Sequence, residues 1–156
     1  MSFGIHRAKP KELNPALRFL EDGLRGGRPL PGGLVERIRR DVAAGDLEIF
    51  VAFSGRDVAG VLTLAYRPSL ASGKVFASVE DLYVRSSERG VGVGGALLMA
   101  AEGRCRERGV SYLEVQADGQ EAQRFYASEG FVGASGIRVM FRSLPLAPAP
   151  HRRRSP

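Results

Sequence analysis

The chain has one cysteine, two histidines and no long apolar run, and each shortage excludes a class of structure. Cys105 alone cannot form an internal disulfide or a metal site built from several cysteines. His6 and His151 lie at opposite ends of the 156 residues, which disfavours a histidine metal site. No window approaches the run of about 20 apolar residues that crosses a bilayer, and the first residues lack the apolar stretch of a signal peptide. We therefore expect a cytoplasmic protein with no metal ion and no membrane contact.

Half of the formal net charge of +6 comes from one end of the chain. Arg152, Arg153 and Arg154 supply three of these charges within a proline-rich tail that lacks hydrophobic periodicity. Such a composition is typical of disorder. We expect one domain over residues 1–144 and a disordered tail over residues 145–156. The rest of the sequence offers no basic face with interleaved aromatic residues, so a nucleic-acid partner is not expected.

Hydrophobic periodicity and turn residues predict the element order β-α-α-β-β-β-α-β-α-β-β, with no internal repeat. Only the segment 76–116 forms a β-α-β unit, so we expect a mixed α/β fold with one parallel strand pair in a largely antiparallel sheet. Residues 23–33 are expected to form an irregular, mobile connection. The expected strands cover 3–8, 48–54, 58–66, 75–84, 111–116, 131–136 and 137–144, and the expected helices cover 10–22, 34–46, 94–108 and 121–130.

The stretch RSSERGVGVGG at 85–95 places four glycines beside two arginines. Glycine exposes backbone N–H groups, and arginine brings a fixed charge, so a phosphate is the first ligand to consider. Gly90, Gly92 and Gly95 match the dinucleotide pattern G-x-G-x-x-G, but RSSER separates them from the preceding strand, and no Gly-Lys-Ser/Thr follows for a P-loop. The alternative is that the N–H groups of residues 90–95 face a pyrophosphate from the N-terminus of a helix.

The strand ahead of the glycines carries two adjacent acids, Glu80 and Asp81, and an irregular apolar spacing. Leu82 and Val84 keep the strand period of two, but the step from Val79 to Leu82 is three. One extra residue predicts a β-bulge at the acids. A bulge can turn both carboxylates toward one cleft, where a carboxylate can take the proton that an ammonium must lose before it attacks.

The segment from Arg89 to Gly94 resembles the Arg/Gln-x-x-Gly-x-Gly/Ala signature of the GNAT superfamily of N-acetyltransferases. The order of the expected elements, the strand YLEVQ and the segment FYASEGF resemble the family as well, so that the likeness covers most of residues 3–142. The resemblance implies the acyl-CoA N-acyltransferase fold, with helices on both faces of a sheet whose parallel pair is splayed. It also implies an enzyme that moves an acetyl group directly from acetyl-CoA to a primary amine.

The resemblance implies where acetyl-CoA is held. The glycine loop would bind its pyrophosphate, and its pantetheine arm would lie in the splay, where a backbone N–H near Leu82 polarises the thioester carbonyl. The implied coenzyme-binding residues are Leu82, Tyr83, Val84, Arg89, Gly90, Val91, Gly92, Val93, Gly94 and Gly95.

The resemblance also implies catalytic roles. The Glu-Asp-x-x-Val arrangement is similar to that of diamine (polyamine) acetyltransferases, which implies that Glu80 is the base and that Asp81 binds the cationic acceptor. Tyr126, in FYASEGF, would donate a proton to the leaving sulfur. The sequence departs from the family at Gly119, where many members carry a coenzyme-binding Asn. Cys105 lies on the apolar face of its helix and is expected to be a core residue rather than a nucleophile.

Several acceptors and partners stay open. The acid pair favours a small cationic amine, while the string Val115-Gln116-Ala117-Asp118 is similar to aminoglycoside 3-N-acetyltransferases. Protein N-termini or lysines are further alternatives, and a non-catalytic acyl-CoA-binding regulatory module is an alternative of another class. Members of the family are often dimers, so the resemblance allows a homodimer.

Overall fold

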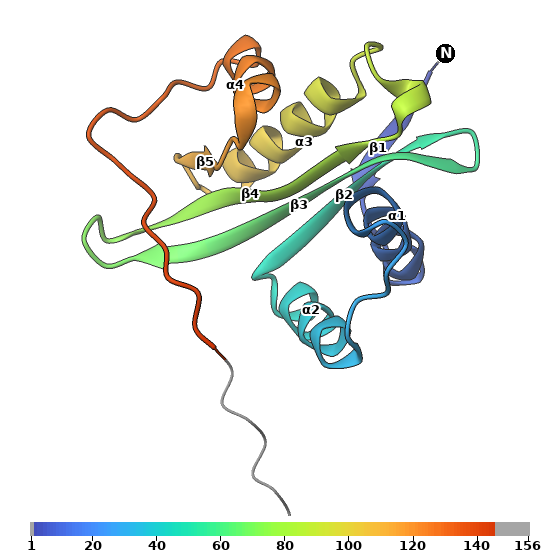
Figure 1. Cartoon of the computed structure of the whole chain (residues 1–156), viewed down its shortest axis with the longest axis horizontal. Coiled ribbons are helices and arrows are strands. Elements are labelled where there is room, and N and C mark those ends of the chain that lie inside the picture. The colour runs from blue at the N-terminus through green and yellow to red at the C-terminus, as the bar shows by residue number, and fades with distance from the viewer. Residues whose placement is uncertain (1, 146–156) are drawn as a thin grey trace, which may run out of the picture.

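The computed structural model describes residues 2–145, which fold around one five-stranded sheet of order β1-β2-β3-β4-β5 (Figure 1). The strands from β1 to β4 pair antiparallel, and β4 and β5 pair in parallel. The expected mixed sheet with one parallel pair is therefore confirmed. The strands are β1 (Gly4–Arg7), β2 (Leu47–Ser54), β3 (Asp57–Ser69), β4 (Lys74–Val84) and β5 (Leu113–Val115).

Helices cover both faces of the sheet, as expected (Figure 1). α1 (Leu13–Arg25) and α2 (Gly32–Ala44) lie on one face, and α3 (Val93–Glu107) and α4 (Gly119–Ser128) lie on the other. Two short 3-10 turns, η1 (Pro10–Glu12) and η2 (Ser86–Glu88), precede α1 and α3 in the chain. None of the helices within residues 2–145 has the length and apolar character to span a membrane.

The sheet separates two apolar cores because successive strand residues face opposite ways. On the α3 side, Leu62 and Leu64 pack with Leu97 and Leu98. On the α1 side, the core contains Leu17, Leu20, Val51 and Val61. Each fully buried side chain of this size contributes about 1.5–3 kcal/mol to stability, so the two cores fix the position of β4 between them.

The connection between α1 and α2 is shorter than the sequence suggests. α1 runs to Arg25 and ends at Gly26 with a positive φ of 60°, and α2 begins at Gly32. The predicted irregular segment 23–33 is thus reduced to residues 26–31. Gly23 lies inside α1, and a Cβ at that position would meet the Tyr83 ring at 2.3 Å. The missing side chain lets α1 approach β4 closely.

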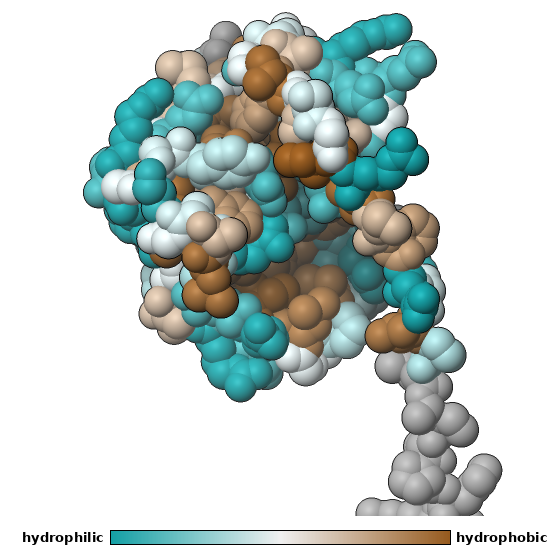
Figure 2. All heavy atoms as spheres, turned by 90° about the vertical axis from the view of Figure 1, so that its left-hand side faces the viewer, coloured by the Kyte–Doolittle hydropathy of each residue, from teal (hydrophilic) through white to brown (hydrophobic). Residues whose placement is uncertain are grey.

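The two strands predicted at 131–136 and 137–144 are wrong: within the described part of the chain, residues 131–145 form no strand. Figure 1 shows this segment as an irregular chain, and Figure 2, which views the molecule from that side, shows apolar side chains on the surface. Gly133 and Gly136 interrupt the segment, and β5 offers only three residues to pair with. The periodicity was real, but no partner strand satisfies the backbone. The exposed apolar side chains include Val132, Ile137, Val139, Met140, Phe141 and Leu144. Apart from Pro145, the predicted disordered tail lies outside the described residues.

Candidate functional site

The predicted bulge is present in β4. Thr63 of β3 is paired with Asp81, but the next residue, Leu64, is paired with Val79, so Glu80 has no partner on β3. Val79 belongs to the core on the α3 side, and alternation then directs Glu80 to the α1 side. The pairing of Asp81 with Thr63 directs Asp81 to that same side, so both acids share one face of the sheet.

The parallel pair parts next to the bulge. β4 pairs with β5 only from Ala77 to Val79, and Glu80 follows immediately. Beyond it, the residues from Leu82 to Val84 bond to β3 on one side only, within the pairing that the structure describes. The backbone of this part of β4 is therefore available to a ligand that lies between the two strands. The expected splay is confirmed.

Asp81 is held by a residue that the sequence did not reveal. The hydroxyl of Thr63, a buried residue, donates a hydrogen bond of 2.7 Å to Oδ2 of Asp81. Burial and then the negative charge of Asp81 raise the pKa of Tyr126 on α4. Thr63 and Asp81 thus form a direct contact between β3 and β4, whereas Tyr126 of α4 packs against the α3-side core.

Glu80 has different neighbours and is exposed. Nη2 of Arg67, on β3, lies 4.0 Å from Oε1 of Glu80 and 3.1 Å from Oε1 of Glu114 on β5. The same guanidinium lies over the ring of Phe76, 5.0 Å from its centroid. Arg67 therefore ties Glu80 to β5. The sequence could not predict this contact because it depends on the register of three strands.

The glycine segment forms the uncapped N-terminus of α3. Gly90 and Gly92 have φ values of 81° and 89°, which only glycine adopts easily. Gly92 is the N-cap and no side chain caps the helix, whose first backbone hydrogen bond runs from Ala96 to Gly92 at 3.0 Å. The N–H groups ahead of Ala96 are those that a helix leaves free. Free N–H groups at a helix N-terminus are suited to bind a phosphate group.

Three residues of the glycine segment also take part in helix packing. The side chain of Val93 is buried in the α3-side core. A Cβ on Gly94 would lie 3.0 Å from Phe125, and one on Gly95 would lie 2.8 Å from the carboxylate of Glu129. Gly94 and Gly95 therefore also allow α4 to pack on α3. Only their backbone groups can face a ligand.

Arg89 lies at the end of η2, beside β4. Its Nε donates to the carbonyl oxygen of Val84 at 3.1 Å, and its guanidinium lies 5.4 Å from the centroid of the Tyr83 ring. Tyr83 in turn packs against Phe19 and Gly23 of α1. A continuous set of contacts thus joins α1 to the arginine of the glycine motif.

Comparison with known proteins decides the family. The sequence profile of the acetyltransferase (GNAT) family matches residues 19–131. The chain belongs to this family. The GNAT match includes the bulged strand, the glycine segment and α4, so it covers every element that forms the candidate site.

Solved structures agree with this fold. A transcriptional regulator from Bacillus halodurans C-125 is 28% identical, with a TM-score of 0.75, 90% of this chain covered and 100% of the other. An aminoglycoside acetyltransferase from an uncultured soil metagenomic sample is 23% identical, with a TM-score of 0.78 and coverage of 92% and 97%. A predicted acetyltransferase with acetyl-CoA from Clostridium acetobutylicum is 16% identical, with a TM-score of 0.71 and coverage of 90% and 96%. No sequence among the curated proteins matches the chain.

GNAT membership confirms part of the predicted function. The protein is an N-acetyltransferase whose acetyl donor is acetyl-CoA. The similar structures include aminoglycoside acetyltransferases, but no subgroup is established, and the acceptor stays a prediction.

Gly119 and Cys105 lie outside the bulge and the glycine segment. Gly119 has a φ of 85°, in the region that glycine favours, at the first turn of α4. Cys105 is buried in the α3-side core, and burial and then the charge of Glu48 raise the pKa of its thiol. A raised pKa disfavours the thiolate at neutral pH, which agrees with the prediction that Cys105 is a core residue.

Proposed function

We propose that this GNAT enzyme acetylates a small cationic amine, with Glu80, Asp81 and Tyr126 as its catalytic groups. One observation carries the proposal: the bulge turns two adjacent carboxylates to one face of the sheet at the point where β4 and β5 part. Two negative charges at the entrance of an acyl-donor site favour an acceptor that arrives as an ammonium.

Asp81 is assigned to acceptor binding. Its Oδ2 accepts the hydrogen bond of Thr63, which limits the rotation of the carboxylate and leaves Oδ1 to face a cation. A carboxylate that is already oriented loses less entropy when it binds an ammonium. Asp81 would hold the amine nitrogen close to the thioester.

Glu80 is assigned to proton removal. It is more exposed than Asp81, and a carboxylate is a group that can accept a proton. Glu80 would take the proton that the bound ammonium loses, so that the nitrogen lone pair can attack the acetyl carbon. The solvent-facing side of Glu80 can then release this proton to water.

Tyr126 is assigned to the leaving group. Burial and Asp81 raise its pKa, so its phenol stays protonated at neutral pH and can deliver a proton to the sulfur as the carbon–sulfur bond breaks. The coenzyme itself would be held by the backbone of Leu82–Val84, by Arg89 and by the N–H groups of residues 90–95. Acetyl-CoA supplies the activated acetyl group.

The test is a thiol-release assay with acetyl-CoA and an amine panel of polyamines, aminoglycosides and peptides with free N-termini or lysines. We expect turnover with polyamines. Glu80→Gln should lower kcat about 100-fold or more, and Asp81→Asn should chiefly raise KM for the amine. Tyr126→Phe should lower kcat. Asp57→Asn, which changes an exposed acid at the start of β3, is the matched control and should behave as wild type.

Other results would point elsewhere. Turnover confined to aminoglycosides would favour the second candidate acceptor, which the likeness in fold to an aminoglycoside acetyltransferase supports. Turnover of peptides alone would contradict the proposal that the acceptor is a small amine. Acetyl-CoA binding without turnover of any amine would indicate a regulatory module. Normal turnover by Glu80→Gln would remove that residue from its role.

A further inference from the structure

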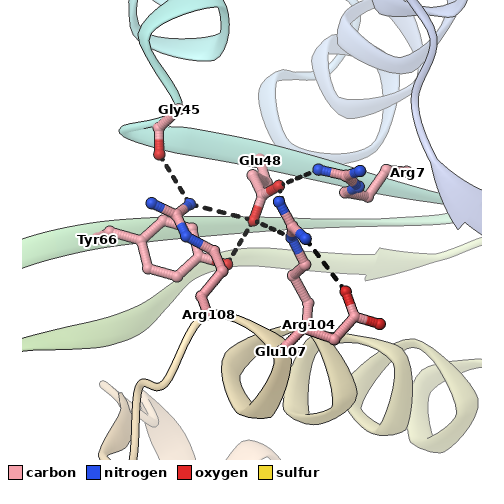
Figure 3. Close-up of polar contacts among 7 residues, drawn as sticks. All are labelled: Arg7, Gly45, Glu48, Tyr66, Arg104, Glu107 and Arg108. Atoms are coloured by element: carbon pink, nitrogen blue, oxygen red, sulfur yellow. Dashed lines mark hydrogen bonds and ion pairs between the residues drawn. The ribbon is translucent and has the colours of Figure 1, made fainter.

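A second charged cluster lies at the other end of α3, around Glu48 (Figure 3). Glu48 belongs to β2, and its side chain is only 8% exposed. Arg7 of β1 donates to Oε2 at 2.6 Å, Arg104 of α3 contacts both oxygens at 3.0 and 3.1 Å, and Arg108 lies 3.4 Å from Oε1. The hydroxyl of Tyr66 also donates to Oε1.

The cluster around Glu48 contains more positive than negative charges. One carboxylate faces three guanidinium groups, and Glu107, bonded to Arg104 at 3.1 Å, is a second acid with an exposed side chain. Lys9 also lines the cavity in front of the cluster. Glu48 and Glu107 offset two of these four positive charges, so the remaining cations repel one another.

A cavity of about 640 Å³ opens onto these cations. It is lined by Arg7, Lys9, Arg104 and Arg108, and Glu48 is the one acid among its lining residues within the described chain. The remaining walls come from the end of α2 and the start of β2. The 15 residues of α3 separate this cavity from the glycine segment by about 22 Å.

Donor groups are left over after the internal contacts are made. Within residues 2–145, Arg7 bonds through Nη1, Arg104 through Nε and Nη1, and Arg108 through Nη1. A guanidinium carries five N–H donors, so each of the three keeps its Nη2 free. Arg108 is fixed by stacking over the Tyr66 ring at 3.7 Å and by a bond to the carbonyl of Gly45 at 2.9 Å.

We propose that this cavity is a second anion site, which binds a phosphate-bearing small molecule away from the acetyl-transfer site. Guanidinium groups match phosphate oxygens in two-point contacts, and here they are already held in place by Glu48. Glu48 orients them while leaving the excess of positive charge unmet. A ligand with two or more negative charges would balance it better than a single carboxylate.

Inorganic pyrophosphate and inorganic phosphate are the probes. Thermal unfolding of the full chain is followed with each probe, with saturating coenzyme A present so that the α3 N-terminus is already filled. At a pyrophosphate concentration ten times its Kd, we expect Tm to rise by about 3–5 °C. Phosphate should give a smaller rise, and sodium chloride at equal ionic strength should give none.

Variants then locate the site. Lys9→Gln leaves the bonds to Glu48 intact, and Arg7→Gln removes the most exposed of the three arginines. Each should lower the affinity for pyrophosphate at least fivefold in calorimetric titration. The matched controls are Lys11→Gln and Arg18→Gln, which remove exposed charges that do not line the cavity and should titrate as wild type.

The proposal fails if the Lys9 and Arg7 variants bind pyrophosphate as tightly as wild type. It also fails if sodium chloride reproduces the rise in Tm, because the cluster is then only a structural brace that responds to screening. Both readouts are binding measurements, so they do not depend on the acceptor amine or on the assigned catalytic residues.

Discussion

Thr63 donates a hydrogen bond of 2.7 Å to Oδ2 of Asp81, directly across the strand pair that borders the bulge. Thr63 is buried, whereas Asp81 is partly exposed, so the bond fixes a surface acid to an interior residue. The bulge directs the acid to the α1 side of the sheet, and the hydrogen bond from the threonine limits its rotation. Thr63 is therefore a positioning residue in the proposed mechanism.

Replacing the hydroxyl tests this relationship. Thr63→Val keeps the shape of the side chain and removes a hydrogen bond to a charged group, which contributes about 1.5–3 kcal/mol. We expect KM for the amine to rise roughly tenfold or more, with little change in KM for acetyl-CoA. Thr63→Ser should restore the wild-type value. A fall in Tm with unchanged KM in the valine variant would reduce Thr63 to a structural role.

The close approach of α1 to β4 gives a second prediction. A Cβ at Gly23 would lie 2.3 Å from the Tyr83 ring, which also contacts Phe19 and Arg89. Gly23→Ala should therefore cost about 1–3 kcal/mol through overpacking, despite the better helix propensity of alanine. It should also raise KM for acetyl-CoA, because a displaced Tyr83 no longer supports Arg89.

Gly103→Ala is the control for this variant. Gly103 lies inside α3, and a Cβ there would meet no atom within 4 Å. The same substitution should then stabilise the protein by about 0.4–1 kcal/mol. Chemical denaturation measures both variants, and equal effects of the two substitutions would contradict the packing explanation.

The Glu48 cluster gives a stability prediction that is independent of any ligand. Glu48→Gln keeps the size of the side chain but removes the carboxylate that three guanidinium groups share, so that Arg104 keeps only the exposed Glu107. A fully buried pair would cost about 3–5 kcal/mol to break, and the partial exposure of the arginines lowers the expected cost to about 2–3 kcal/mol. Glu107→Gln removes an acid that is 69% exposed from the same Arg104, and should cost less than about 1 kcal/mol.

The same acid makes stability depend on pH. Burial alone would raise the pKa of Glu48, but hydrogen bonds from Tyr66, Arg7 and Arg104 outweigh burial and lower it. A lowered pKa in the folded state means that the stabilisation is complete above the unfolded value and is lost as the pH falls through the folded value. As the pH falls from neutral into the acid range, the Tm of the wild type should therefore fall more steeply than that of Glu48→Gln.

Much of the chain could be predicted from local patterns. The step of three from Val79 to Leu82 marked the bulge, because this signal acts within a few residues. Thr63 and Arg67 were missed because their partners lie on other strands, 18 and 47 positions away. The cluster around Glu48 was missed for the same reason.

The errors also have a physical origin. The segment 137–144 has strand periodicity, but a strand forms only where another strand satisfies its backbone. The glycines at 94 and 95 suggested a ligand alone, yet they also make room for Phe125 and Glu129. The local sequence shows which conformations the backbone can adopt. Tertiary contacts decide which of these conformations forms and what each glycine does.

The ionisation of Tyr126 gives a further prediction. Burial and the charge of Asp81 raise its pKa, so Asp81→Asn should lower this pKa relative to the wild type while the contribution of burial remains. The tyrosinate absorbance of the wild type, less that of Tyr126→Phe, isolates Tyr126 among the four tyrosines. The same subtraction, with Asp81→Asn present in both proteins, gives the shifted midpoint.

The raised pKa of Tyr126 also makes the stability of the protein depend on pH. Because the folded pKa of Tyr126 is raised, its contribution is complete below the unfolded value of about 10 and is lost as the pH rises through the folded value. Asp81→Asn should therefore make the alkaline loss of stability smaller and complete at lower pH, while its onset near the unfolded pKa is unchanged. An unchanged titration midpoint for Tyr126 in this variant would show that Asp81 does not act on the phenol, and would separate the acceptor-binding acid from the proton donor.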